Sequence, residues 1–491
     1  MKDYFFMKYF CIAAMFAVCS CAKKETPPPN IVIIFTDDQG YSDVGVFGAK
    51  GFETPHLDAM ASEGMKFTDF YVGSSVCSPS RAALLTGCYP QRIGIPAVLF
   101  PERTNTEWKP DERRTKTGIH KDETTMAEML KINGYATGVF GKWHLGHHKQ
   151  FLPLQQGFDE YFGLPYSNDM RPGKKKNKQS YPDLPLMDGN QTHRFMEDDQ
   201  SMLTTEYTEH AIDFIRKNKD NPFFVYLPHS MPHIPLYASE KYSGHSEKGI
   251  YGDVIEEIDW SVGQINKTLK ELDLEENTLV IFTCDNGPWL IFGDHGGSAD
   301  PLREGKFTTF EGGQRVPCIM KWPNVIPKAS ITSEIASTID LLPTIAAITG
   351  SKLPQNKIDG LDISGLLYGK ETKSPRDEFF FYKGWKLEAV RSGKWKLHVP
   401  HAYSMVVESD SGNVHGRKGI KSNIELSLFD LSKDKSETTN LAAQYPEVVE
   451  SLMQKIEEMK KDLGDSEGTG AGKRDCGWQI EPEEWPVKKR V

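Results

Sequence analysis

The run Ile31-Val32-Ile33-Ile34-Phe35 restricts the fold more than any other segment of this chain. Its side chains are all β-branched or aromatic, which is typical of a strand buried on both faces of a parallel sheet. Similar strands are predicted at 135–140, 222–227 and 278–284. Helical patterns lie between them, so the sequence predicts an α/β domain with a large, mainly parallel sheet flanked by helices. The predicted helices are 55–63, 125–133, one that ends at 213–218, and 255–272.

The pattern changes near residue 373, where short alternating segments begin. These segments predict a smaller C-terminal antiparallel sheet, and residues 446–462 predict a final helix. A chain of 491 residues is too long for one compact core. We therefore expect a main domain at 30–372, a C-terminal antiparallel subdomain at 373–463, and a loosely ordered tail rich in Gly, Lys and Glu at 464–491. The four alternating segments are 379–382, 389–391, 395–399 and 426–430.

The N-terminus has the features of an export signal. Lys2 and Lys8 precede the apolar run 9–18, which suits a signal peptide and is too short to span a bilayer. The sequence Val-Cys-Ser-Cys then resembles a bacterial lipobox, with Cys21 as the lipidated residue, Cys19 as the competing choice, and cleavage without lipid as the alternative. We expect a signal peptide at 1–21 and an exported bacterial protein, periplasmic or on the outer membrane, that touches the membrane only through its lipid.

The net charge is −10, which argues against binding to nucleic acid. It also means that an anionic substrate must be met by local cations. Five cysteines follow the leader, and this odd, scattered set does not form a disulfide framework. They are Cys77, Cys88, Cys284, Cys318 and Cys476.

Two acidic or amide pairs each follow a predicted buried strand. Asp37-Asp38 comes after the first strand, and Asp285-Asn286 comes after the strand at 278–284. Either pair alone is more often part of a turn or a helix cap. Because sites in parallel sheets collect at the carboxyl ends of strands, we expect the two pairs to lie together, where a cation must neutralise them. Hard oxygen ligands favour calcium or magnesium over zinc, and we favour calcium.

Basic residues and histidines follow other predicted strands. Lys142 and His144 lie in the Gly-flanked loop after residue 140, and His233 lies in Pro232-His233-Ile234-Pro235, beyond the strand that ends at residue 227. His229 is nearer that strand and remains an alternative. Lys306 precedes the Gly-rich segment 310–313. Each of these residues alone would be a solvated side chain, but an anionic substrate requires such cations.

The segment Cys77-Ser78-Pro79-Ser80-Arg81 has a Pro two residues after the Cys and an Arg four residues after it. Read alone, it fits an ordinary inert thiol in a turn before a helix at 81–85. Its spacing also resembles the signal by which the sulfatase family has its nucleophile oxidised to formylglycine. Segments in family order extend the resemblance from about residue 30 to about residue 441, nearest to the arylsulfatase A and N-acetylgalactosamine-6-sulfatase members. These segments include 54–58, 156–158, 165–167 and 428–434.

The resemblance implies an alkaline-phosphatase-like fold, hydrolysis of a sulfate ester through a formylglycine-sulfate intermediate, and a formylglycine-generating enzyme as a maturation partner. Cys77 becomes formylglycine, and its hydrate binds the calcium. The substrate is a sulfated carbohydrate or an aryl sulfate, with the carbohydrate favoured. The implied metal ligands are Asp37, Asp38, Cys77, Asp285 and Asn286.

The resemblance also implies roles for the remaining polar residues. Arg81 and Lys142 place positive charge beside the nucleophile, and His144 removes its remaining proton. His233 protonates the departing alkoxide, and the Pro-His-x-Pro form favours it over His229. Lys306 and Ser167 hold the sulfate. His398, within the family-like segment 392–398, either faces the sugar or is a structural strand histidine.

The sequence departs from the family at Cys88, where the family usually has an arginine, and in the basic insert 174–179. That insert is predicted to be a solvated loop near the cleft that could grip an acidic polysaccharide. The sequence leaves two alternative functions open. One is a phosphodiesterase or phosphonate hydrolase of the same superfamily, and the other is a non-catalytic sulfated-glycan-binding lipoprotein in which Cys77 is never oxidised.

Overall fold

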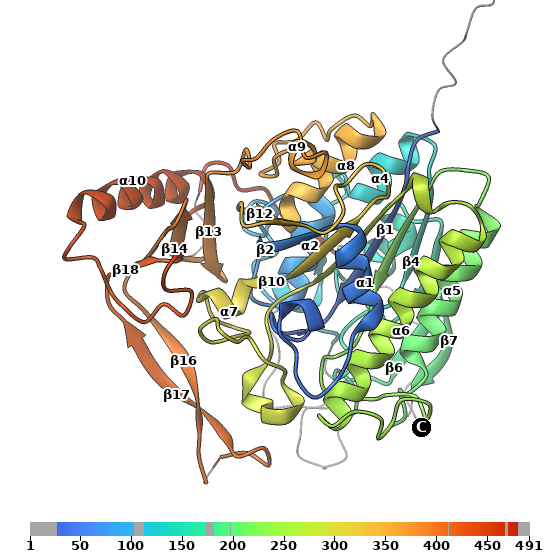
Figure 1. The fold of residues 1–491 in the computed structure, drawn as a ribbon, viewed down its shortest axis with the longest axis horizontal. Helices are drawn as coiled ribbons and strands as arrows, with labels where there is room; N and C mark the ends of the chain where they lie inside the picture. Colours follow the sequence, from blue (N-terminus) through green and yellow to red (C-terminus); the bar gives the residue numbers. More distant parts are fainter. Residues whose placement is uncertain are drawn as a thin grey trace, which may run out of the picture.

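The computed structural model describes residues 27–102, 112–172, 181–196, 198–410, 412–466 and 470–479. Figure 1 shows a large domain, whose central sheet is covered by helices on both faces, and a smaller unit with its own sheet at one side. The predicted α/β class with a smaller C-terminal antiparallel sheet and helix is confirmed. The lipobox and the insert 174–179 lie outside the described residues. Within the described part of the chain, no helix is long and apolar enough to cross a membrane.

The central sheet places several strand ends at one edge. Its strands in spatial order are β11 (Ser330–Thr332), β2 (Met65–Tyr71), β10 (Arg315–Lys321), β9 (Thr278–Cys284), β1 (Asn30–Thr36), β8 (Phe223–Pro228), β4 (Ala136–Phe140), β5 (Glu160–Gly163), β6 (Leu184–Asp188) and β7 (Gln191–Met196). β1 is parallel to both of its neighbours, β8 and β9, and β4 is parallel to β8. β10 is antiparallel to β9. The carboxyl ends of β9, β1, β8 and β4 therefore meet at the same edge.

Alternate residues of β1 enter two different cores. Ile31, Ile33 and Phe35 pack on the side covered by helices α2 (Cys77–Thr86), α4 (Met126–Ile132) and α8 (Leu341–Thr349). Val32 and Ile34 pack on the side of α1 (Pro55–Glu63), α5 (Leu203–Lys217) and α6 (Ile250–Glu271). All five side chains are fully buried. This confirms that the opening apolar run is a strand covered on both faces.

The element bounds differ from the sequence predictions in a few places. α6 begins at Ile250 instead of residue 255, because Tyr251 and Val254 already face the core. α2 begins at Cys77 instead of Arg81, so the Cys-x-Pro segment forms the first helical turn. A proline is tolerated in a first turn because that backbone position has no intrahelical acceptor.

The smaller unit contains a sheet in the order β13 (Glu378–Lys383), β14 (Lys386–Ser392), β15 (Trp395–His398) and β18 (Ser427–Asp430), with helix α10 (Pro446–Leu463) beside it. A separate hairpin, β16 (His401–Glu408) and β17 (Arg417–Ile424), extends away from this sheet (Figure 1). Buried ion pairs join the two units. Arg391 contacts Asp69 at 2.7 Å, and Lys396 contacts Glu311 at 3.0 Å.

The expectation of a loosely ordered tail from residue 464 is wrong for its described part. Gly477 and Trp478 form β19, which pairs with β3 (Thr117–Gly118) in the main domain. Arg474 forms an ion pair with Glu123 at 2.6 Å. Composition suggested disorder, but a short strand pairing and one half-buried ion pair hold this segment.

Candidate active site

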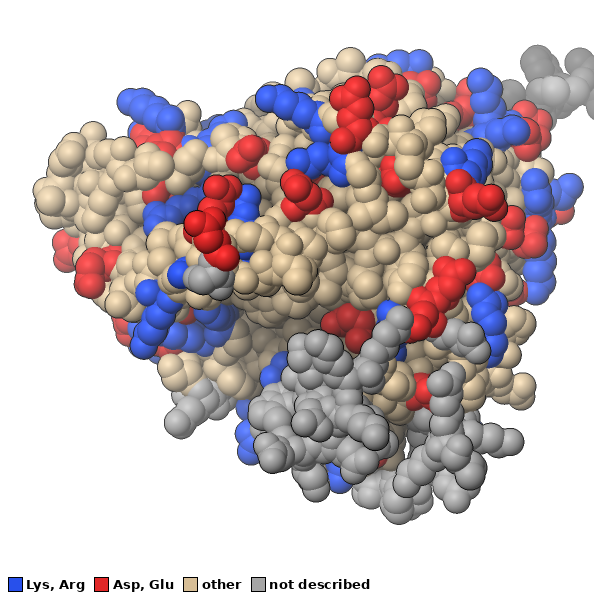
Figure 2. All heavy atoms as spheres, turned by 90° about the horizontal axis from the view of Figure 1, so that it is seen from below, with Lys and Arg blue, Asp and Glu red and all other residues tan. Residues whose placement is uncertain are grey.

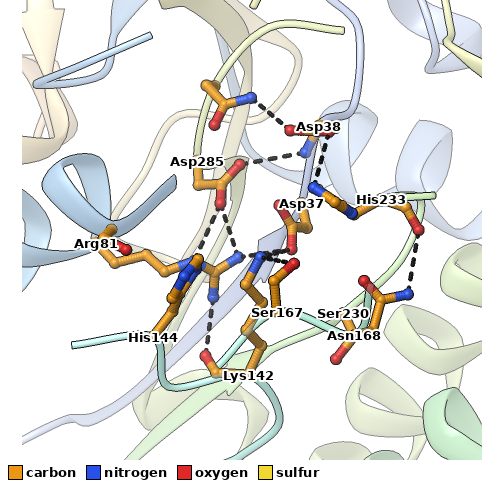
Figure 3. Close-up of polar contacts among 12 residues, drawn as sticks. Asp37, Asp38, Arg81, Lys142, His144, Ser167, Asn168, Ser230, His233 and Asp285 are labelled. Carbon is orange, nitrogen blue, oxygen red and sulfur yellow. Dashed lines mark hydrogen bonds and ion pairs between the residues drawn. The ribbon is translucent and has the colours of Figure 1, made fainter. Parts of the chain in front are cut away.

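The two acidic or amide pairs meet at neighbouring strand ends, as predicted. Asp37 and Asp38 follow β1, and Asp285 and Asn286 follow β9. The backbone N–H of Asp38 donates to Oδ1 of Asp285 at 3.2 Å, and Nδ2 of Asn286 donates to Oδ1 of Asp38 at 2.7 Å (Figure 3). All four residues are buried. Asp38 has a positive φ of 64°, which turns the chain sharply after β1.

This group of side chains fits an oxygen-ligated divalent cation. Oδ1 of Asp37 and Oδ1 of Asn286 are buried and have no hydrogen-bond partner among the described residues. Buried oxygens without partners are costly, and a cation would satisfy both. Ligand atoms of Asp37, Cys77 and Asp285 lie within 4.8 Å of one another. The donors are carboxylate and amide oxygens, which suit calcium or magnesium.

Cys77 is the first residue of α2, and Arg81 lies one turn later on the same helix. Arg81 donates to Oδ2 of Asp285 through Nε at 3.0 Å and through Nη2 at 2.8 Å. Its Nη1 donates to the backbone oxygen of Lys142 at 2.9 Å. Burial raises the pKa of the Cys77 thiol, because the low-dielectric surroundings disfavour the thiolate. An unmodified Cys77 would therefore be a protonated, weak nucleophile.

Lys142 reaches the same centre from the loop after β4. Its Nζ contacts Oδ2 of Asp37 at 2.5 Å and donates to Oγ of Ser167 at 3.0 Å. Gly141 precedes it with φ of 139°, and a Cβ there would lie 2.0 Å from the oxygen of Pro228. Glycine is required at that position for the loop to pass so close to the end of β8.

The charge on Asp37 is set by its basic neighbours. Burial would raise the pKa of this carboxyl group, but Lys142 and Arg81 outweigh that effect and hold the pKa well below its usual range. Asp37 is therefore ionised. Its Oδ1 is available to a cation while its Oδ2 is held by Lys142.

His144 is a buried, neutral imidazole with one free nitrogen. Its Nε2 lies 3.0 Å from the backbone oxygen of Leu99 and so must donate a hydrogen there. Its Nδ1 has no hydrogen-bond partner in the described parts of the chain. Burial, together with Lys142 and Arg81, holds the pKa of His144 well below its ordinary value. Nδ1 therefore carries a lone pair that can accept a proton.

The structure brings His233, and not His229, to the acidic centre. Nε2 of His233 lies 3.5 Å from Oδ2 of Asp38, and Nδ1 lies 2.6 Å from the backbone oxygen of Ile234 (Figure 3). His229 is buried against Ser261 of α6, with Nε2 3.1 Å from its Oγ. Burial and then Lys306 lower the pKa of His233, so it is neutral in the free site.

Lys306 completes the ring of positive charge. Its Nζ lies 2.7 Å from Oδ1 and 2.8 Å from Oδ2 of Asp38. Burial would lower the pKa of Lys306, but Asp38 outweighs it and raises the pKa above its ordinary value. Viewed from the side at which β1 ends, the surface is hollowed, and Lys and Arg side chains border one side of the hollow (Figure 2).

Comparison with known proteins agrees with this geometry. Residues 29–351 match the sulfatase family, and residues 374–476 match the C-terminal region of aryl-sulfatase. The chain belongs to the sulfatase family. It is a sulfuric ester hydrolase.

This sulfatase is similar to curated and solved members of the family. It is 38% identical to arylsulfatase A of Bos taurus over 456 residues, covering 88% of this chain and 87% of that one. It is 41% identical to N-acetylgalactosamine-6-sulfatase of Canis lupus familiaris, covering 76% and 72%. The crystal structure of the PsFucS1 sulfatase from Pseudoalteromonas sp. superposes with a TM-score of 0.76 at 25% identity, covering 92% of each chain. The fold is alkaline-phosphatase-like, and the phosphodiesterase alternative is not favoured.

Among the described residues, His398 contacts Glu437 and neighbouring aromatic rings and none of the proposed catalytic residues. Its ring is fully buried, Nε2 lies 2.8 Å from Oε1 of Glu437, and it stacks on Phe310. The alternative of a structural strand histidine therefore describes it, and the expectation that it faces the sugar is wrong. An alternating strand pattern does not say which face of β15 meets the main domain.

An arginine from a distant segment contacts Cys88, the position at which the family usually has an arginine. Cys88 is buried directly after the turn that ends α2. Nη2 of Arg474, from the C-terminal segment, lies 3.5 Å from its Sγ. A guanidinium group therefore contacts this position of the sulfatase from another part of the chain.

The sequence did not indicate one residue at the site. Trp289, three residues after Asn286, places its ring beside His233 and Lys306. Its place so soon after Asp285-Asn286 is the sequence feature that could have indicated a residue of the site.

Proposed function

We propose that this sulfatase hydrolyses a sulfated carbohydrate with Cys77 converted to formylglycine and one calcium bound by Asp37, Asp38, Asp285 and Asn286. The observation that carries the proposal is the position of Cys77. It begins α2, is buried, and lies within 4.8 Å of carboxylate oxygens of Asp37 and Asp285. A protonated thiol could not attack a sulfate there, so the oxidised residue is needed.

The hydrated aldehyde supplies an oxygen nucleophile, and calcium neutralises the carboxylates and the anionic substrate. Around that position Arg81 and Lys142 are fixed by buried hydrogen bonds, Arg81 to Asp285 and Lys142 to Asp37. Fixed positive charge in a water-excluded site favours an oxyanion without reorganisation.

His144 is the proposed base. Its Nε2 hydrogen is committed to Leu99, so Nδ1 is the atom that accepts a proton from a hydroxyl group at position 77. Its lowered pKa keeps it neutral and ready to accept that proton.

Lys306 and Ser167 are the proposed sulfate-binding residues. Nζ of Lys306 lies on the Asp38 side of the centre, and Oγ of Ser167 lies on the Lys142 side. The two groups approach from different loops, and each carries a donor. Together they would fix the orientation of the sulfate.

His233 is the proposed acid for the leaving alcohol. Its Nδ1 hydrogen is held by Ile234, which leaves Nε2 as the exchanging atom. An anionic sulfate beside the ring raises the pKa of His233, because negative charge favours the imidazolium form. Substrate binding therefore favours the protonated form of His233, which is the acid that an alkoxide leaving group needs.

A carbohydrate substrate is supported by the name of one group of relatives, N-acetylgalactosamine-6-sulfatase.

We further propose export through the segment 1–21, with a lipid on Cys21, and maturation of Cys77 by a formylglycine-generating enzyme. Attachment is tested by metabolic labelling with a fatty-acid probe in the native host, where Cys21→Ser should abolish labelling.

The function is tested with protein purified from the native host. A panel of monosaccharide sulfates and 4-nitrophenyl sulfate is incubated with it, and released inorganic sulfate is measured. The proposal expects sulfate release from at least one sugar sulfate and loss of that activity in Cys77→Ala. Release from 4-nitrophenyl sulfate alone would overturn the carbohydrate assignment.

A further inference from the structure

Three aromatic side chains form a cluster at the edge of the catalytic centre. Trp289 contacts Phe292, with ring centroids 4.8 Å apart, and Phe307, with centroids 5.4 Å apart. Both pairs are close to edge-to-face, at 75° and 66°. Trp289 and Phe292 are partly exposed, and Phe307 is 39% exposed. We call these three residues the aromatic rim.

Trp289 joins the aromatic rim to the residues that handle the leaving group. Its ring centroid is 5.6 Å from that of His233, and Nζ of Lys306 lies 4.5 Å from the centroid of the indole. Lys306 and His233 both face Asp38, at 2.7 Å and 3.5 Å. Trp289 therefore borders the space between the proposed sulfate-binding lysine and the proposed acid, which is where the ester oxygen must lie.

Phe307 is held in an unusual backbone conformation. Its φ is 71°, in the left-handed region that a bulky residue rarely adopts. Its backbone N–H donates to the oxygen of Ser75 at 3.1 Å, close to Cys77 in the chain. Its ring packs on Trp289 and remains 39% exposed beside the catalytic centre. Strain of this kind is concentrated at ligand-binding positions.

The C-terminal hairpin supports the aromatic rim from the other side. Nδ2 of Asn413, in the connection between β16 and β17, donates to the backbone oxygen of Ile291 at 2.7 Å. The ring of His415 lies 5.6 Å from that of Phe292. The smaller unit thus fixes the loop that carries Trp289.

We propose that Trp289, with Phe307 beside it, is the platform on which the pyranose ring of the sulfated sugar lies. This inference rests on the proposed function, because the ring is the alcohol released at His233. A pyranose has a face of C–H groups that an indole can cover, and a partly exposed aromatic ring beside convergent polar groups is typical of a ligand site. Trp289 is then a specificity-determining residue that contacts the sugar and not the sulfate.

The experiment compares Trp289→Ala, Trp289→Phe and the matched control Trp260→Ala. Trp260 is another partly exposed tryptophan under a lysine, with Nζ of Lys241 5.4 Å from its ring, but it lies on α6. The best sugar sulfate from the panel is the substrate, and KM and kcat are measured separately. Binding of the same sugar sulfate is also measured by calorimetry in the Cys77→Ala background.

Trp289→Ala is expected to raise KM for the sugar sulfate about tenfold and to weaken binding by the same factor, with kcat changed much less. Trp289→Phe should recover most of the loss, and Trp260→Ala should behave as wild type. An unchanged KM and affinity in Trp289→Ala, while wild type hydrolyses the sugar sulfate, would overturn this inference and leave the proposed function standing.

Three further outcomes would also contradict the inference. A fall in kcat without a change in affinity would show that Trp289 only positions His233 and Lys306, which contradicts the platform. A larger effect on 4-nitrophenyl sulfate than on every sugar sulfate would show that the rim binds aryl groups. Failure of wild type to release sulfate from any sugar would refute the proposed carbohydrate function and this inference together.

Discussion

Arg81 donates two hydrogen bonds to one carboxylate oxygen of Asp285, from Nε at 3.0 Å and from Nη2 at 2.8 Å, and both side chains are fully buried. The pair links the helix that begins with Cys77 to the end of β9. It therefore holds the nucleophile position and a proposed metal ligand in one fixed arrangement.

Replacement of Arg81 by Ala should destabilise the protein by about 3–5 kcal/mol, because it leaves a buried carboxylate without its partner. Urea denaturation at saturating calcium measures this change. The control is Arg194→Ala, whose pair with Glu206 is partly exposed and should contribute less than about 1 kcal/mol. Equal, small effects of the two substitutions would contradict the account of Arg81.

Removal of the metal should lower both stability and activity. At free calcium a hundredfold above its Kd, binding adds about 2.7 kcal/mol to the free energy of unfolding, and a chelator removes that contribution. Metal analysis should find one calcium per wild-type chain and none in Asp285→Ala. The exposed Asp199→Ala should bind calcium like wild type. Stoichiometric zinc, or full activity after chelation, would refute the calcium site.

His233→Ala should impair hydrolysis of a sugar sulfate far more than hydrolysis of 4-nitrophenyl sulfate. A sugar alkoxide is a basic leaving group that needs an acid, whereas nitrophenolate leaves without one. General-acid contributions are about 10² to 10⁴ in rate. His229→Ala is the control, because that ring contacts Ser261 in the core. A selective loss in His229→Ala, with equal losses on both substrates in His233→Ala, would reverse the assignment.

His144→Ala should differ from His233→Ala. The proposed base acts after the alcohol has left, so both substrates should be affected alike. Mass analysis of the protein during turnover should show sulfate retained on the peptide that contains residue 77. Absence of a sulfated peptide, with normal turnover, would remove His144 from the mechanism.

Asp43 should make stability depend on pH. Burial is the main cause that raises the pKa of this carboxyl group to about 6, although Tyr251 and the backbone of Ser298 and Gly40 donate to it. Because the pKa in the folded state lies above that in the unfolded state, the contribution of Asp43 is largest below about pH 4 and is lost as pH rises through about 6. The difference in unfolding free energy between wild type and Asp43→Asn should therefore shrink from pH 4.5 to pH 7.5. A difference that grows would contradict this sign.

The sequence predicted the parts of the fold in which local pattern and burial agree. The run that forms β1 is apolar at every position because both of its faces are covered. Asp38 and Asp285 were then predicted as site residues from their positions directly after buried strands alone. Lys142 and His144 were also expected at a strand end, but their roles came from the family resemblance. The importance of Cys77 was available only through that resemblance, because its segment alone fits an inert thiol in a turn.

Other features depend on contacts between distant segments. β10 was not predicted, because its antiparallel pairing with β9 and β2 is set by the sheet and not by its own pattern. His398 was placed wrongly because its partner, Glu437, is 39 residues away. The strained Phe307 and the contact of Trp289 with His233 arise only when three loops meet.

The most direct test of the central claim is the mass of the peptide that contains Cys77 in active protein from the native host. The account predicts a peptide in which oxygen has replaced sulfur and two hydrogens have been lost, and which reacts with a hydrazide. Cys77→Ala should have no activity, because it lacks the group that becomes the nucleophile. Its melting temperature should be almost unchanged, because the substitution only shortens one small side chain at the start of α2. An intact Cys77 that is fully alkylated in an enzyme with full sulfatase activity would contradict the account.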